Sequence, residues 1–235
     1  MKLVICSGAG LSAESGIPTF RTSGGLWHSH SIDEVCNLKT FYPNYDKVHD
    51  FYNKRRVELK NVQPNLAHHK IAELSKRYEV HNLTTNVDDL LERAGAENIV
   101  HMHGLITEVV QNYDSDHETI IDIGHNELNY LDVSHYPLKP NVVFFNEYAP
   151  KYQDFSNIMA DVAQTDIVII VGSSENVFLF VENVTLLGGF YGKTVFVNPD
   201  LKLCNRVEDH VTEVFNMNAT DFFEQIESLV PELKV

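Results

Sequence analysis

The sequence has few cysteines and no long hydrophobic run, and each shortage excludes a class of protein. Its 235 residues contain three cysteines, Cys6, Cys36 and Cys204, whose wide spacing fits neither a disulfide framework nor a zinc site. A reducing, cytoplasmic location is therefore expected. The best candidate for a membrane segment, Ile167–Val171, is much shorter than the roughly 18–20 apolar residues that a spanning helix needs. The first residues lack the pattern of a secretory signal.

Positive charge is also scarce. Lys and Arg number 18 against 33 Asp and Glu, which gives a net charge of −15. Phosphates are repelled by such a surface, so neither nucleic acid nor an anionic membrane is an expected partner. Hydrophobic residues make up 43% of the chain and charged residues 22%, as is usual for a globular protein. The length predicts one domain, or a large domain that carries a small insert.

Short apolar runs alternate with segments of helical character. The predicted strands are Lys2–Ser7, Tyr78–Thr84, Asp166–Val171 and Lys193–Val197. The predicted helices are Asp46–Lys60, Ala67–Arg77, Asp88–Ala94, Asp154–Ala163 and Ala219–Leu229. This alternation predicts an α/β fold, in which helices cover both faces of a Rossmann-like parallel sheet.

Residues 105–137 break the alternation, because they are acidic and histidine-bearing and show no helical period. They are interpreted either as a small inserted module or as a set of short antiparallel strands. The expected organisation is one core over residues 1–235, with a large domain formed by residues 1–30, 75–104 and 138–235. Residues 31–74, which are mainly helical, and residues 105–137 would form the small module.

A glycine-rich turn, Gly8-Ala9-Gly10-Leu11-Ser12-Ala13, directly follows the first predicted strand. Its two glycines would let backbone N–H groups approach a phosphate, and the helix that follows would point its positive end at the anion. Ala13 stands where a third glycine is common, and no convincing acidic residue follows about 20 positions later. A tight turn that needs a positive φ angle is the alternative.

The next residues are more specific. In Ser15–Arg21, Pro18 stiffens the loop, Phe20 offers an aromatic face, and Arg21 can contact a phosphate or a ribose. The stretch from Gly8 to Arg21 resembles the opening signature of the sirtuins, the NAD-dependent protein-lysine deacylases. Further sirtuin-like motifs follow in the family's order: Asn86-Val87-Asp88, His103-Gly104, Leu138–Phe145, Gly172-Ser173-Ser174 and Asn198. The resemblance spans nearly the whole chain.

The resemblance implies a mechanism with NAD as the cofactor and acylated-lysine proteins or peptides as partners. The acyl oxygen attacks the ribose carbon that bears nicotinamide, and a histidine then activates a ribose hydroxyl as general base. The products are nicotinamide, free lysine and O-acyl-ADP-ribose. His103 would be that base, with Asn86 as a second catalytic residue, and neutral imidazole suits the task. His101 would share a strand face with His103 and is the structural alternative.

By the same resemblance, most of the motif residues would bind NAD. The implied cofactor-binding residues are Gly8, Ala9, Gly10, Ser12, Ala13, Pro18, Thr19, Phe20, Arg21, Trp27, Thr85, Asn86, Val87, Asp88, His103, Gly172, Ser173, Ser174, Asn198, Pro199, Asp200 and Ala219. The implied substrate-binding strand contains Val142, Val143, Phe144 and Phe145. For Asn86-Val87-Asp88, the start of a helix at Asp88 is a compatible structural explanation.

A Tyr and an Arg three residues apart, Tyr52 and Arg55, resemble the pair that marks sirtuins favouring negatively charged acyl groups. Residues i and i+3 of a helix share a face, and a guanidinium can pair with the carboxylate of a succinyl or malonyl group. We therefore expect desuccinylation or demalonylation beside deacetylation. The structural alternative is a solvated basic stripe formed by Lys54, Arg55 and Arg56.

The sequence departs from the family where most sirtuins carry four zinc-binding cysteines, because residues 105–137 contain none. His117, His125 and His135 lack the spacing of a paired-ligand site, so no metal is expected and packing would hold the module. Thr85 replaces the usual Gln. The chain resembles a minimal catalytic core and is expected to be a monomer. The alternatives for its function are NAD consumption by ADP-ribosyl transfer or hydrolysis, and a non-catalytic NAD or ADP-ribose sensor.

Overall fold

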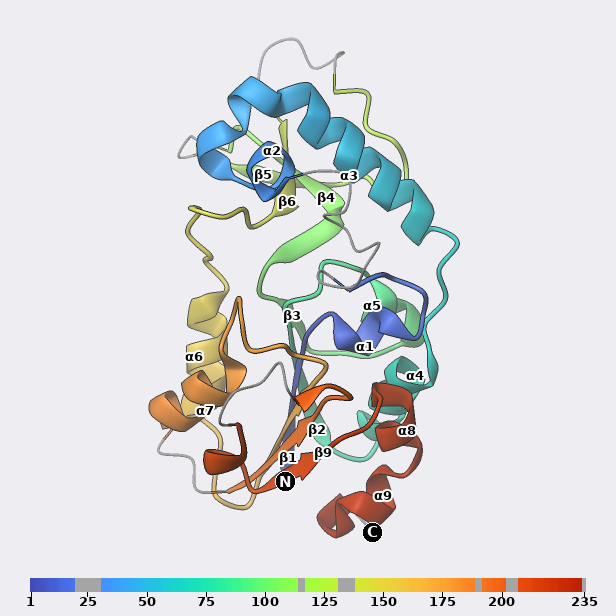
Figure 1. Ribbon diagram of the computed structural model, residues 1–235, viewed down its shortest axis with the longest axis vertical. Coiled ribbons are helices and arrows are strands. Elements are labelled where there is room, and N and C mark those ends of the chain that lie inside the picture. The colour runs from blue at the N-terminus through green and yellow to red at the C-terminus, as the bar shows by residue number, and fades with distance from the viewer. Residues whose placement is uncertain (20–30, 114–116, 131–137, 189–191, 202–206, 234–235) are drawn as a thin grey trace.

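The computed structural model describes residues 1–19, 31–113, 117–130, 138–188, 192–201 and 207–233, and its centre is a six-stranded sheet (Figure 1). The strands, in their order across the sheet, are β3 (Ile99–His101), β2 (Glu79–Thr84), β1 (Lys2–Ser7), β7 (Ile167–Val171), β8 (Lys193–Val197) and β9 (Glu213–Phe215). Neighbouring strands are parallel throughout. The carboxyl ends of all six strands therefore meet at one edge.

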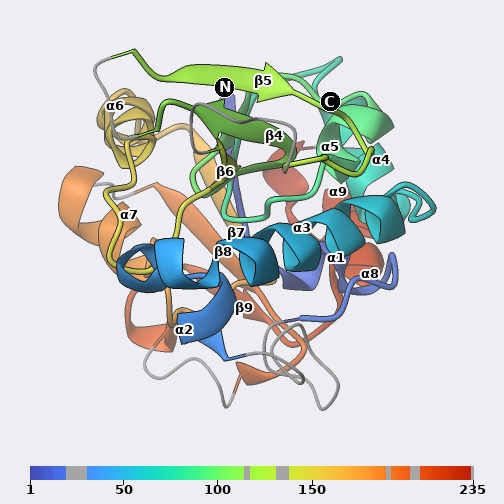
Figure 2. The ribbon, with the colours of Figure 1, turned by 90° about the horizontal axis from the view of Figure 1, so that it is seen from above.

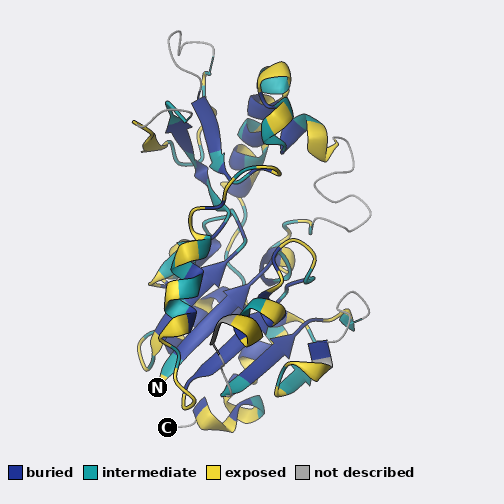
Figure 3. Ribbon diagram, turned by 90° about the vertical axis from the view of Figure 1, so that its left-hand side faces the viewer, coloured by how far each residue is buried: buried dark blue, intermediate teal, exposed yellow. Residues whose placement is uncertain are grey.

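Helices cover both faces of this sheet, as the sequence predicted. Side chains alternate along β1, so Leu3 and Ile5 join one core cluster and Val4 and Cys6 the other. The first cluster packs against α1 (Gly10–Ala13), α4 (Leu66–Leu74), α5 (Leu90–Ala94), α8 (Ala219–Glu224) and α9 (Ile226–Leu229). The second packs against α6 (Tyr152–Ala160) and α7 (Phe180–Gly188). The central strands of the sheet are buried and the outer helix faces are exposed (Figure 3).

A small module lies beyond the carboxyl edge of the large sheet (Figures 1 and 2). It contains α2 (Ile32–Val35), α3 (Tyr45–Leu59) and an antiparallel sheet in the order β5 (Thr119–Asp122), β4 (Gly104–Gln111) and β6 (Leu138–Val142). The short antiparallel strands agree with the sequence interpretation. The boundary at residue 138 was wrong, because β6 pairs with β4 and not with the large sheet. The sheet to which β6 belongs is set by its pairing with distant residues, and the local sequence pattern gives no sign of that pairing.

Two polar residues of α3 fasten the module. Arg56 is only 1% exposed and donates from Nε to the carbonyl of Ile106 on β4 at 2.8 Å. The Asn53 amide donates to the carbonyl of Leu128 at 2.9 Å and accepts from its N–H at 2.9 Å. Burial lowers the pKa of Arg56 to about 10. Arg56 is therefore a core residue, which excludes the solvated stripe that the sequence left open for it.

All four predicted strands and all five predicted helices are present, with ends shifted by a few residues. The predicted helix Ala219–Leu229 is divided into α8 and α9 at Gln225. Strands β3 and β9 and helix α7 were not predicted. Both strands have three residues of intermediate burial, so they show no apolar run from which a strand could be predicted.

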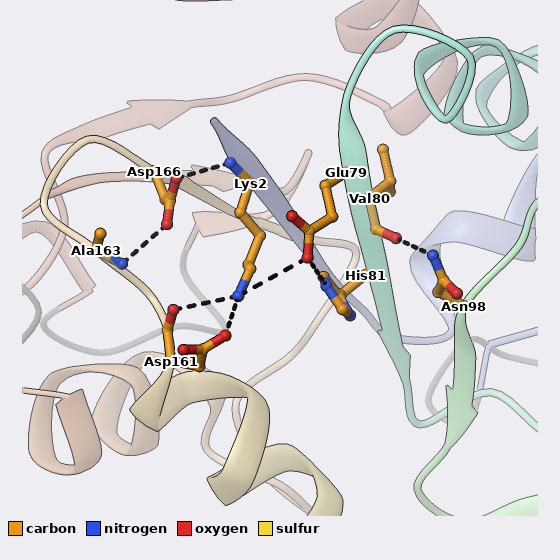
Figure 4. Close-up of polar contacts among 8 residues, drawn as sticks. All are labelled: Lys2, Glu79, Val80, His81, Asn98, Asp161, Ala163 and Asp166. Atoms are coloured by element: carbon orange, nitrogen blue, oxygen red, sulfur yellow. Dashed lines mark hydrogen bonds and ion pairs between the residues drawn. The ribbon is translucent and has the colours of Figure 1, made fainter.

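The amino ends of the central strands are closed by charged residues (Figure 4). Lys2 Nζ lies 2.5 Å from a carboxylate oxygen of Asp161 and 4.0 Å from one of Glu79. The backbone N–H of Lys2 donates to Asp166, whose second oxygen accepts from the N–H of Ala163. In the described part of the chain, no helix is long and apolar enough to cross a membrane. The chemistry-bearing motifs gather at the opposite, carboxyl edge.

Candidate active site

Three glycines bring the first turn and the end of β7 into direct contact. A Cβ atom on Gly8 would lie 2.8 Å from the carbonyl oxygen of Gly172, and one on Gly10 would lie 2.5 Å from the Cα of Gly172. Gly172 itself has a φ of +63°, which favours glycine. The N–H of Gly8 donates to Val171 and that of Gly10 to Gly172. The two amides are thus paired with the backbone, and the glycines allow two loops to pack; a role of this turn in binding a phosphate stays a prediction.

Beside this turn, Ser12 is the centre of a buried polar network. Its hydroxyl donates to Asp88 Oδ2 at 2.9 Å and accepts from the Asn86 amide at 3.2 Å. His68 Nε2 lies 3.5 Å from the same hydroxyl, and Nδ1 of that ring lies 2.9 Å from Oδ1 of Asn65. Burial raises the pKa of Asp88. The predicted residues of α1 and of the segment after β2 thus form one polar surface.

The ends of β7 and β8 supply a second set of polar groups. Asn198 donates from its amide to the carbonyl of Ser173 at 2.6 Å, and the hydroxyl of Ser173 donates to Glu175 at 2.6 Å. Glu175 has a φ of +51° and also accepts from the N–H of Val181. Burial raises the pKa of Glu175. The loops predicted to bind the nucleotide therefore lie together, with a carboxyl group that the sequence had not indicated.

Two histidines that are two residues apart have opposite electrostatics. His101 contacts the carbonyl of Asn86 and the carboxylate of Glu92, at 2.9 and 2.7 Å. Burial opposes the charged form of His101, but the hydrogen bond and charge of Glu92 outweigh it and raise the pKa. Burial lowers the pKa of His103 to about 4, against a weaker opposing hydrogen bond to the carbonyl of Thr85. His103 is therefore neutral at physiological pH, whereas Glu92 favours the charged form of His101.

The predicted substrate strand begins directly beside His103. The N–H of Val143 donates to the carbonyl of His103 at 2.9 Å, and Gly104 pairs with Val142. A Cβ atom on Gly104 would lie 2.0 Å from the carbonyl oxygen of Asn141, so only glycine fits here. Phe144 is buried, whereas Phe145 is 42% exposed. The strand that would present a peptide is thus fixed to the residue predicted to act as base.

The predicted acyl-pocket pair lies on α3 under this strand. Tyr52 is 4% exposed, stacks on Phe144 with ring centroids 5.8 Å apart, and bonds through its hydroxyl to the thiol of Cys36. The guanidinium of Arg55 lies over Phe51, 5.1 Å from the ring centroid, and donates to Glu58 at 2.8 Å. The Nε atom of Arg55 is buried and makes no hydrogen bond within the described part of the chain. Tyr52 is thus packed structurally, while Arg55 keeps an unpaired donor.

The remaining predicted site residues differ in where they lie. Phe20, Arg21 and Trp27 are outside the described residues. Ala13 is the last residue of α1. Loops or short turns at the carboxyl edge contain Ala9, Pro18, Thr19, Thr85, Val87, Ser174, Pro199 and Asp200. The hydroxyl of Thr85 donates to the carbonyl of Ser7 at 3.3 Å, so it serves the backbone. The methyl group of Ala219 lies in the core at 4% exposure, which argues against direct contact with a nucleotide.

Three residues of the site were missed by sequence reasoning. Tyr152, the first residue of α6, lies with its hydroxyl 2.8 Å from Nε2 of His103. His68 and Glu175 join the two networks described above. For His68 a signal existed, since Asn65 precedes it at the spacing of a capping box. Tyr152 and Glu175 belong to no motif, and only the fold brings them to the site.

Comparisons with known proteins agree with this geometry. The sequence profile of the Sir2 family matches residues 8–178. A protein of Helicobacter hepaticus named NAD-dependent protein deacylase is 42% identical over 196 residues, covering 75% of this chain and 76% of that protein. A Helicobacter pylori protein of the same name is 43% identical over 178 residues, covering 75% and 74%.

Solved structures give the same answer. An ADP-ribose complex of a mutant Sir2 homologue has a TM-score of 0.84 at 29% identity and covers all of this chain and 94% of its own. An NAD complex of a Sir2 homologue has a TM-score of 0.79 at 30% identity, with 98% and 90% covered. A two-part architecture with a neutral histidine between a glycine turn and the strand predicted to bind the substrate is typical of a sirtuin-like enzyme. The chain belongs to the Sir2 family.

Proposed function

We propose that this Sir2-family protein is an NAD-dependent protein-lysine deacylase that removes acetyl groups and also succinyl or malonyl groups. The single observation that carries the proposal is the position of His103. Its ring is neutral and is hydrogen-bonded to the backbone of Thr85, the residue before Asn86, and its own carbonyl accepts from the N–H of Val143 of the predicted substrate strand. A base in this place touches both the nucleotide end and the peptide end of the site.

The polar groups at the carboxyl edge suit a dinucleotide, which is consumed as a substrate. Ser12, Asn86 and Asp88 offer one hydroxyl, one amide and one carboxyl group within a single hydrogen-bonded network. Such a set can both donate to and accept from a carboxamide and ribose hydroxyls. Bound NAD would supply the reactive ribose carbon and nicotinamide as leaving group. The residues of the chain orient the ribose and keep the site partly desolvated.

His103 is suited to accept a proton from a ribose hydroxyl. A neutral imidazole has one nitrogen that carries hydrogen and one that accepts it, and the ring donates to the carbonyl of Thr85. The other nitrogen is thereby kept as the acceptor. Because burial disfavours the imidazolium form, the base stays unprotonated well below pH 6.5.

The preference for acidic acyl groups is proposed from Arg55. Its guanidinium is positioned by Phe51 on one side and Glu58 on another, and its buried Nε makes no hydrogen bond among the described residues. A carboxylate accepting that hydrogen bond would satisfy the group. Tyr52 and Phe144 stack beside it and would form an apolar wall.

The test is a mass-spectrometric assay with NAD and three peptides that differ only in an acetyl-, malonyl- or succinyl-lysine. We expect free lysine and nicotinamide to appear in equal amounts, with turnover of all three peptides. Nicotinamide release without freed lysine would instead support NAD hydrolysis or ADP-ribosyl transfer. Binding of NAD with no nicotinamide released in the presence of any acyl peptide would support a sensor and refute the enzyme.

A further inference from the structure

The hydroxyl of Tyr152 is hydrogen-bonded to Nε2 of His103, the ring nitrogen that would accept the proton. Its oxygen lies 2.8 Å from Nε2 of His103, within the range of a strong hydrogen bond. Since the neutral ring donates its one N–H to the carbonyl of Thr85, Nε2 accepts and the Tyr152 hydroxyl donates. A ribose hydroxyl that approaches His103 therefore meets Tyr152 at that nitrogen.

The surroundings of Tyr152 hold this contact in place. The residue opens α6, and its ring packs edge-on against Phe178 with centroids 4.7 Å apart. Phe178 in turn packs against Phe155 of the same helix at 5.1 Å. Tyr152 itself is half-buried, so one side of its ring is fixed by aromatic packing while the hydroxyl remains at the border of the site. Moving the hydroxyl away from His103 would require repacking of this aromatic cluster.

We propose that Tyr152 is a further catalytic residue, which relays the proton from the ribose hydroxyl to His103. The proposal rests on the deacylase function given above. In the relay, the ribose O–H bond breaks and its proton passes to the Tyr152 oxygen, while the phenolic proton of Tyr152 passes to Nε2 of His103. The ribose oxygen keeps the electron pair and forms the bond to the acyl carbon, whose double bond to the lysine nitrogen becomes a single bond as its π electron pair moves to that nitrogen. Tyr152 is neutral before and after, and His103 becomes imidazolium.

This relay uses the observed contact as it stands. Direct transfer to Nε2 would first break the hydrogen bond from Tyr152 and displace a packed ring. Relay through the hydroxyl needs only a ribose oxygen within hydrogen-bond distance of Tyr152. Proton transfer of this kind contributes to the acyl-transfer stage alone, because loss of nicotinamide precedes it and requires no base.

The test compares Tyr152→Phe with wild type in two reactions. Phe keeps the packing on Phe178 and removes only the hydroxyl. We expect single-turnover deacylation to fall roughly 10- to 100-fold, while exchange of labelled nicotinamide into NAD, in the presence of acyl peptide, stays within twofold. In mixtures of H₂O and D₂O, two protons that move together make the rate a quadratic function of the deuterium fraction, which we expect for the wild type. A single moving proton gives a linear dependence, which we expect for the variant. Tyr148→Phe, an 80% exposed tyrosine four residues away, is the matched control.

A second readout needs no activity. In ligand-free protein, the ¹⁵N resonance of His103 Nε2 should move toward that of an unbonded acceptor in Tyr152→Phe and stay in place in Tyr148→Phe. Unchanged or faster deacylation in Tyr152→Phe would overturn the relay, as would equal loss of deacylation and exchange in a folded variant. A folded wild-type protein that releases no nicotinamide with any acyl peptide would overturn the deacylase function, and the relay with it.

Discussion

The backbone carbonyl of His103 accepts a hydrogen bond from the N–H of Val143 at 2.9 Å. This one bond joins the residue that would act as base to the strand that would hold the peptide. Because Gly104 pairs with Val142 in the same register, a displacement of either segment moves the other. The accuracy of the site therefore depends on the register between β4 and β6, and the following prediction tests that dependence.

Replacing Gly104 with alanine should disrupt this register. Its φ is +81° and a Cβ atom would lie 2.0 Å from the carbonyl oxygen of Asn141, so the backbone has to move. We expect a loss of more than about 2 kcal/mol in the free energy of unfolding and a severe loss of deacylation. Gly95→Ala is the matched control, because its φ is +89° but nothing lies within 4 Å. It should cost only about 1–2 kcal/mol. Similar denaturant midpoints for both variants would contradict the account.

Replacing Arg55 with methionine should separate the acyl substrates. Methionine keeps most of the apolar stem but removes the guanidinium, so an acidic acyl group loses its charged hydrogen bonds. We expect kcat/KM for a succinyl-lysine peptide to fall roughly 10- to 100-fold, with less than a threefold change for the acetyl peptide. The neighbouring exposed residue Lys54, changed to methionine, is the control. Equal losses on both peptides would remove Arg55 from the pocket.

Removing the charge of Glu58 should improve the binding of an acidic acyl group, in contrast to the removal of Arg55. Its carboxylate lies 2.8 Å from Arg55 and competes with an acidic acyl group for the guanidinium. Glu58→Gln should therefore lower KM for a succinyl-lysine peptide by about two- to fivefold, since an exposed pair is worth at most about 1 kcal/mol. Glu73→Gln breaks the Lys70–Glu73 pair, which has the same spacing and distance on α4. It should leave KM unchanged. A higher KM in Glu58→Gln would show that Glu58 supports the pocket.

Stability should fall with acidification because of three buried histidines. Burial lowers the pKa of His49, of His68 and of His103 to about 4, against 6.5 when unfolded. Below pH 6.5 the unfolded chain binds protons that the folded chain does not, so stability is complete above that value and declines toward pH 4. Between pH 6.5 and 5.5 the loss should be about 3 kcal/mol, measured by urea unfolding. His68→Gln should reduce this dependence, whereas exposed His69→Gln should not. A flat profile in the parent protein would contradict the burial of these three rings.

Some of this architecture could be predicted from local sequence, and some could not. The strand Ile167–Val171 is wholly buried, so its five aliphatic residues form a visible run. By contrast, Leu138–Val142 carries a lysine and a proline, and its place in the small sheet depends on pairing with distant β4. The same holds for Lys139, whose charge is buried against Glu147 at 2.9 Å.

The candidate active site also has some features that local sequence predicts and others that it does not. Its motif residues could be placed on loops after strands, because parallel strands put their carboxyl ends at one edge. The packing role of Gly8 and Gly10 could not be predicted, because their amides donate to backbone carbonyls more than 150 residues away. Tyr152 is the clearest case: 49 residues separate it from His103, and no spacing rule connects a helix-opening tyrosine with a histidine after β3.

The role of His103 as base is tested most directly by the variant His103→Tyr under single-turnover conditions. The same preparation is used to measure NAD binding, nicotinamide exchange and the release of free lysine. Acyl peptide is present in the exchange assay and in the lysine-release assay. The account predicts that freed lysine falls by a factor of about 10²–10⁴, while NAD binding and nicotinamide exchange persist. Undiminished release of lysine by the folded variant would contradict it.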